Sequence, residues 1–155
     1  MSRIQESIEL YVPVSTAYNQ WTQFEEFPNF MEGVESVTQL DDTRLHWVAE
    51  FGGVRREWEA KIIDQTPDSH IAWDGGSEDP SGSVTFEPVA PDRTRVTLSM
   101  EYEPRDAKEK AGDVLGVAKR RVKGDLERFK KFLESRKVET GAWRGNVEGG
   151  RSISR

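Results

Sequence analysis

Three residues on predicted inward-facing positions, Arg56, Glu6 and Tyr102, have side chains capable of chemistry, and the first two interrupt apolar patterns. Arg56 shares one face of an alternating run with Trp58, and its guanidinium could bind a ligand carbonyl or carboxylate, or polarise an enolate. Glu6, between two isoleucines, and Tyr102, at the end of another alternating run, are candidate proton carriers. Alternatives stay open, because Arg56 can extend to water past the sheet edge and Glu6 can lie on a frayed strand.

The hairpin that carries Arg56 gives the most specific structural pattern in the chain. A Gly52-Gly53 pair separates two alternating runs and favours a two-residue turn, since glycine accepts a positive φ. The resulting register places eight side chains on one face, as the pairs Phe51–Val54, Ala49–Arg56, Trp47–Trp58 and Leu45–Ala60. The other face carries the pairs Glu50–Arg55, Val48–Glu57, His46–Glu59 and Arg44–Lys61. One face is therefore apolar and rich in tryptophan, and the other is largely charged.

The remaining patterns predict an α+β domain over residues 1–137. Alternation and turn residues predict strands near 8–12, 34–40, 70–73, 83–87 and 93–103, besides the hairpin at 44–64. A helix capped by Ser15 and a second short helical turn near Pro28 follow the first strand. Residues 138–155 are polar and rich in glycine, which favours a flexible tail in which Trp143 is the one candidate for docking.

A long helix over residues 106–136 completes the domain, and its apolar stripe changes in size along its length. The stripe is small at Ala111 and Ala118 and bulky from Leu126 onward, so a helix laid on the sheet would leave space at its small end. The alternative is that aromatic side chains of the sheet fill that space. The predicted cavity residues are Trp47, Ala49, Arg56, Trp58, Trp73, Phe86, Leu98 and Met100 from the sheet, and Ala111, Leu115, Ala118 and Val122 from the helix.

Composition limits the function further. A net charge of -6 argues against general binding to nucleic acids or anionic membranes, and the absence of cysteine excludes thiolate chemistry. Both histidines, His46 and His70, are expected on the outer face, so we predict no metal site and no cofactor. Asp125 lies at the edge of the helix stripe, flanked by Arg121 and Arg128, and is expected to form ordinary salt bridges with them. Without a signal peptide or membrane-spanning run, we expect a cytoplasmic protein without stable membrane insertion, as a monomer or dimer.

The order of elements resembles the helix-grip fold of the START-like (SRPBCC) superfamily, in which a curved antiparallel sheet of about seven strands wraps around a long C-terminal helix. The motifs that look like its polyketide cyclase/dehydrase and coenzyme-Q-binding branch are Ile8–Tyr18, Phe24–Pro28, Phe30–Val34, Ile71–Trp73 and Phe86–Pro88. The resemblance covers about residues 3–137. It implies a deep apolar cavity that binds hydrophobic small molecules such as quinones, lipids or polyketides.

Two hypotheses follow for the function. The first is binding or carriage of an apolar, ring-containing small molecule without catalysis, since the sequence shows no complete catalytic set. The second is a polyketide aromatase/cyclase or dehydratase, in which a shaped cavity orients a reactive chain and Arg56 acts as the electrophile. An interaction module that uses the tail and the basic helix surface ranks third.

Overall fold

A computed structural model describes residues 2–51, 54–75, 81–102, 112–136 and 138–153. Strand β1 (Ser2–Leu10) is followed by helix α1 (Val14–Trp21) and a short 3-10 helix, η1 (Phe24–Asn29). The strands that follow are β2 (Val34–Gln39), β3 (Arg44–Phe51), β4 (Val54–Thr66), β5 (His70–Asp74), β6 (Ser81–Ala90) and β7 (Arg93–Tyr102). Helix α2 (Gly112–Arg136) comes next, and two short strands, β8 (Asn146–Glu148) and β9 (Arg151–Ile153), end the chain.

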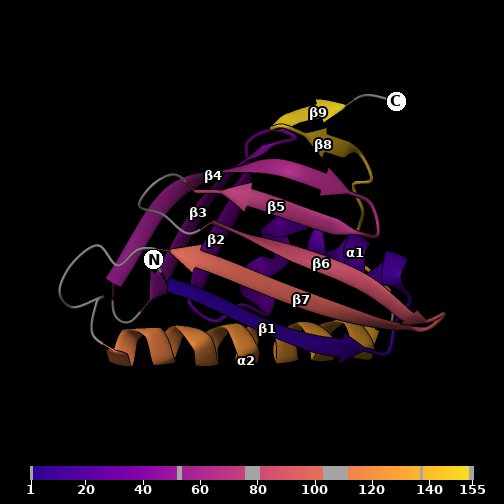
Figure 1. The fold of residues 1–155 in the computed structure, drawn as a ribbon, viewed down its shortest axis with the longest axis horizontal. Coiled ribbons are helices and arrows are strands. Elements are labelled where there is room, and N and C mark those ends of the chain that lie inside the picture. The colour runs from indigo at the N-terminus through magenta and orange to yellow at the C-terminus, as the bar shows by residue number, and fades with distance from the viewer. Residues whose placement is uncertain (1, 52–53, 76–80, 103–111, 137, 154–155) are drawn as a thin grey trace.

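The described strands form one antiparallel sheet of nine, in which seven follow the order β1-β7-β6-β5-β4-β3-β2, β8 pairs with β4, and β9 pairs with β8. The sheet curves from β1 over β5 and β4 and back through β3 and β2, and α2 runs along its open side next to β1 (Figure 1). The predicted α+β helix-grip architecture is confirmed. Ser15 does not cap α1, because Pro13 occupies the N-cap position and no side chain caps the helix. Residues 106–111 of the predicted long helix lie outside the described ranges.

The core is thickest where α1, η1 and the C-terminal half of α2 meet. Phe129 of α2 is fully buried, and its ring lies 5.0 Å from the rings of both Trp21 and Phe30. Leu126 and Leu133, one helical turn away on either side, are also buried. The bulky end of the helix stripe therefore fills the core as the sequence predicts.

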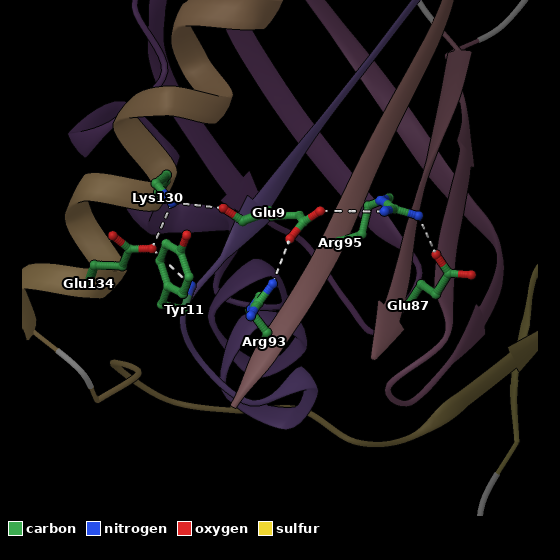
Figure 2. Close-up of polar contacts among 7 residues, drawn as sticks. All are labelled: Glu9, Tyr11, Glu87, Arg93, Arg95, Lys130 and Glu134. Atoms are coloured by element: carbon green, nitrogen blue, oxygen red, sulfur yellow. Dashed lines mark hydrogen bonds and ion pairs between the residues drawn. The ribbon is translucent and has the colours of Figure 1, made fainter. Parts of the chain in front are cut away.

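Polar side chains of α2 also fasten the helix to the end of β1. Lys130 Nζ donates to the carbonyl of Glu9 at 2.8 Å, and Glu134 accepts a hydrogen bond from the backbone N–H of Tyr11 at 2.9 Å. Figure 2 shows these contacts together with the Glu9 carboxylate, which lies between Arg93 and Arg95. Side chains of the helix thus satisfy backbone groups at a sheet edge that would otherwise be open to another strand.

The C-terminal segment, for which the sequence predicts a flexible tail, packs against the domain over residues 138–153. Val147 is fully buried, and β8 pairs with β4 through Asp64 and Gln65. The backbone of Thr140 donates to Gln20 of α1 at 2.8 Å, and that of Trp143 donates to Thr22 at 3.1 Å. These partners are distant in sequence, and the local composition of the segment gave no sign of them.

Candidate functional site

The inner face of the β3–β4 hairpin has the composition that the sequence predicts. All eight predicted pairs are present in the register, from Arg44 opposite Lys61 to Phe51 opposite Val54. The rings of Trp47 and Trp58 stack with centroids 5.8 Å apart and planes 5° from parallel. Trp58 is 8% exposed, and Trp47 packs against the core. The Nε1 atom of Trp47 is buried and has no hydrogen-bond partner among the described residues.

Arg56 lies on this inner face and is buried. It is 4% exposed, opposite the fully buried Ala49 and two residues from Trp58. The alternative in which Arg56 extends to water past the sheet edge is therefore wrong. Burying a cationic side chain is costly unless polar groups surround its charge. A guanidinium in this position can donate to a carbonyl, carboxylate or enolate oxygen.

The other predicted sheet residues belong to the buried core cluster or pack against it. Phe86 is enclosed in the packed core, with its ring 5.4 Å from that of Tyr18 and 6.3 Å from that of Trp21. Trp73 is 8% exposed and approaches Gly82, where a Cβ atom would lie 3.0 Å from the indole ring. Leu98 is buried and Met100 is half-buried on β7. Phe86, Trp73 and Leu98 therefore all belong to the core, and Met100 packs against them.

The helix side of the predicted cavity is described only in part. Val122 is half-buried and packs against the core. Ala111 lies outside the described residues, as do the side chains of Leu115 and Ala118. The small half of the helix stripe therefore remains a prediction.

The remaining catalytic candidates have different positions. Glu6 is half-buried on β1 opposite Leu98, which puts it on the same face as that buried leucine. Tyr102 ends β7 opposite Ser2, and its side chain lies outside the described residues. These positions leave Glu6 as a candidate for the inner face and give no role to Tyr102.

Both histidines contact carboxylates on the outer face. His46 lies opposite Glu59 in the register, as predicted, and its Nε2 atom lies 3.2 Å from the carboxylate of the diagonal neighbour Glu57. Diagonal neighbours across the strands are within reach of long side chains, and Arg44 likewise approaches Glu59 at 3.6 Å. His70 Nε2 lies 2.8 Å from Asp64. The described residues contain no group of three or more histidine or carboxylate side chains that could hold a metal ion.

Asp125 forms the salt bridge that the sequence predicts, and it is also buried. It is 9% exposed, pairs with Arg128 and accepts a hydrogen bond from the backbone N–H of Glu32 at 3.0 Å. Burial raises the pKa of Asp125 to about 6, although Arg128, the Glu32 N–H and Arg121 all oppose the rise. Desolvation outweighs these favourable contacts because the carboxylate has lost nearly all of its water.

The docked C-terminal segment helps to form a surface pocket that the sequence did not predict. Trp143 lines an open pocket of about 450 Å³. Its other walls come from η1 and the β2–β3 connection, with the residues Thr22, Gln23, Phe24, Glu25, Glu26, Gln39, Asp41 and Asp42. This pocket lies apart from the predicted cavity, because none of the predicted cavity residues lines it. Only tertiary docking brings its three segments together.

In the described part of the chain, no helix combines the length and apolar character that crossing a membrane requires.

Comparison with known sequences identifies a family and a relative in another organism. Residues 10–131 match the family model described as polyketide cyclase/dehydrase and lipid transport. A Streptomyces lincolnensis protein, described as an uncharacterized 17.2 kDa protein in the melC2-rnhH intergenic region, is 54% identical over 149 residues. That alignment covers 95% of this chain and 99% of the relative.

Solved structures with the same fold include an enzyme and a START protein. The ZhuI aromatase/cyclase of Streptomyces sp. R1128 has a TM-score of 0.73 at 14% identity, over 92% of this chain and 99% of that one. A START superfamily protein of Mycobacterium smegmatis has a TM-score of 0.67 at 17% identity, over 86% of this chain and 95% of that one. At these identities the likeness establishes the START-like helix-grip fold alone.

Proposed function

The chain belongs to the polyketide cyclase/dehydrase and lipid-transport family, and from this premise we propose that it binds a hydrophobic, ring-containing small molecule between the sheet and α2. At the general level, the family and the fold support either hydrophobic ligand binding or polyketide cyclisation. The observation that carries the proposal is the buried Arg56 on a face lined by the stacked Trp47 and Trp58. Aromatic side chains suit a flat apolar ligand, and one guanidinium suits a single oxygen-bearing group on it.

In the proposed site, apolar side chains would contact the ligand's rings and one charged side chain would bind its polar group. Trp47, Trp58 and Ala49 would contact the ligand's ring system and exclude water from it. Arg56 would donate to a carbonyl or carboxylate, and the low dielectric around it would strengthen that bond. The buried Nε1 of Trp47 supports the same assignment, because it supplies a second donor on this face.

Cyclisation is the second candidate, and the half-buried Glu6 is the observation that favours it. A carboxylate on the same face as Leu98 could take a proton from an activated methylene while Arg56 stabilises the enolate oxygen. Turnover of a poly-β-ketone mimic, abolished in both Glu6→Gln and Arg56→Met, would favour this enzyme function over carriage. A protein that binds the mimic and returns it unchanged would exclude it.

Titration with a matched ligand pair tests the binding proposal. We expect Arg56→Met to weaken binding of 2-naphthoic acid by about ten- to a hundredfold, the cost of one charge-assisted hydrogen bond. Binding of 2-methylnaphthalene, which lacks the carboxylate, should stay within about threefold. Arg55→Met is the matched control, since the adjacent Arg55 is exposed on the outer face and pairs with Glu35. Equal losses for both ligands, or a loss in the control, would contradict direct recognition by Arg56.

A further inference from the structure

The middle of α2 is fastened to the loop before β2 and to strand β3 by three side chains that lie on one side of the helix. Arg128 Nε donates to the carbonyl of Phe30 at 2.9 Å, and Asp125 accepts the N–H of Glu32 at 3.0 Å. Arg121, one turn before Asp125, donates to the carbonyl of Glu50 near the end of β3. We call Arg121, Asp125 and Arg128 the clasp. Each of them bonds to backbone, so the clasp holds the loop before β2 and the end of β3 in position against the helix.

Gly33, in the loop that the clasp binds, allows the helix and β3 to approach closely. Gly33 has a φ of +90°, and a Cβ atom at this position would lie 2.8 Å from the carbonyl oxygen of Glu50 and would collide with Arg121. The N–H of Glu50 donates to the Gly33 carbonyl at 2.7 Å, which ties the loop at residues 30–33 to the hairpin. The helix, the loop and the end of the hairpin thus meet at one point, where only glycine leaves room for the guanidinium.

The clasp buries a charged group, the Asp125 carboxylate, and the closed arrangement therefore carries a desolvation free energy. Asp125 faces Arg121 and Arg128 from its own helix and Glu32 from the loop, and Glu50 offers only its backbone carbonyl to the clasp. The Glu32 carboxylate lies 3.9 Å from each arginine and is mainly exposed. Opening would return the Asp125 carboxylate to water, which recovers the solvation that burial removed. The raised pKa of Asp125 is the sign of that cost.

The clasp lies beside the inner face described above. Glu50 directly follows Ala49, the cross-strand partner of Arg56, and Met31 of the clasped loop is buried in the core. We propose that the clasp is a releasable fastening that governs entry of the ligand at the hairpin end of the sheet. This inference rests on the proposed function, because it assigns a route to the same site.

A single cysteine tests whether the clasp opens. The chain contains no cysteine, so a thiol placed by Met31→Cys is the sole target of 5,5′-dithiobis(2-nitrobenzoate). We expect Arg128→Met in this background to raise the labelling rate by about ten- to a hundredfold, the factor for one charge-assisted hydrogen bond. Lys130→Met is the control, since it removes a cation from the same helix at the β1 contact. Amide exchange of Glu32 in the cysteine-free protein gives a second measure, in case the cysteine perturbs the loop.

Stopped-flow binding of N-phenyl-1-naphthylamine tests the role in entry. If the clasp governs access, Arg128→Met raises the association and dissociation rates by a similar factor and leaves Kd within about threefold. Unchanged labelling and exchange in Arg128→Met would overturn the fastening. Faster labelling with unchanged probe rates would overturn the role in entry. A wild-type protein that takes up neither this probe nor 2-naphthoic acid would refute the proposed function, whereas labelling would still decide whether the clasp opens.

Discussion

Two aspartate–arginine pairs in this protein have the same spacing and opposite electrostatic outcomes. Asp41 and Arg44 are three residues apart, as are Asp125 and Arg128. Contacts with Arg44 and the N–H of Thr43 lower the pKa of Asp41 to about 2, because solvent still reaches both side chains. Burial raises the pKa of Asp125 to about 6 despite a similar set of partners. The sign of a pKa shift thus depends on the water that the fold removes, more than on the ion pair.

The largest difference between the pairs should appear when each arginine is removed. We expect Arg128→Met to lower the free energy of unfolding by about 3 kcal/mol at pH 8, because an ionised carboxylate stays buried without its main counter-charge. The loss should be smaller at pH 5, where Asp125 is largely protonated. Urea denaturation at both pH values measures this, with Arg44→Met as the matched control in solvent. A loss that is the same at both pH values would show that Arg128 acts by packing alone.

The pH dependence of stability should separate the two aspartates by sign. The folded pKa of Asp125 exceeds its ordinary value of 3.8, so its contribution is present below pH 4 and is lost as the pH rises through 6. This loss amounts to roughly 2 kcal/mol between pH 4 and pH 7. Asp41 has a lowered pKa, so its contribution is present above pH 3.8 and is lost as the pH falls through 2.

Comparison with Asp125→Asn separates the contribution of the Asp125 carboxylate to the pH dependence of stability from that of the other carboxylates. The difference in unfolding free energy between wild type and Asp125→Asn should change by the amount above from pH 4 to pH 7, whatever the other carboxylates do. Asp41→Asn should give a difference that is flat over this range. A flat difference for Asp125→Asn would mean that its carboxylate is better solvated than the structure indicates.

The smallest effect is expected at the exposed pair. Arg44→Met should leave the melting temperature unchanged within error, since exposed ion pairs contribute little. The same change should move the carboxyl titration of Asp41, followed by carbon-13 NMR, upward from about 2 toward its ordinary value. The titration of Asp125, with its midpoint near 6, should not move. A shift at Asp125 would reveal coupling between the two aspartate–arginine pairs.

Elements with a repeating local pattern were predictable from this sequence, and elements held by single contacts were not. The Gly52-Gly53 pair and strict alternation specified the register from Arg44–Lys61 to Phe51–Val54, because a one-residue slip would turn Trp47 and Trp58 toward water. The docked C-terminal segment depends on Val147 and Trp143, two apolar residues without periodicity in a polar stretch. Its docking surfaces are α1 and β4, which exist only once the domain has folded.

The candidate site divides in the same way. The sequence alone determined that Arg56 shares a face with Ala49 and Trp58, since side chains on a strand alternate and the turn sets the register. Tertiary structure decided that Arg56 is buried, that Phe86 joins the packed core, and that Asp125 closes a clasp with the loop before β2. Local geometry fixes direction along a strand or helix, whereas burial depends on which distant segments exclude water from a side chain. For a charged residue that exclusion sets its pKa and its energetic cost.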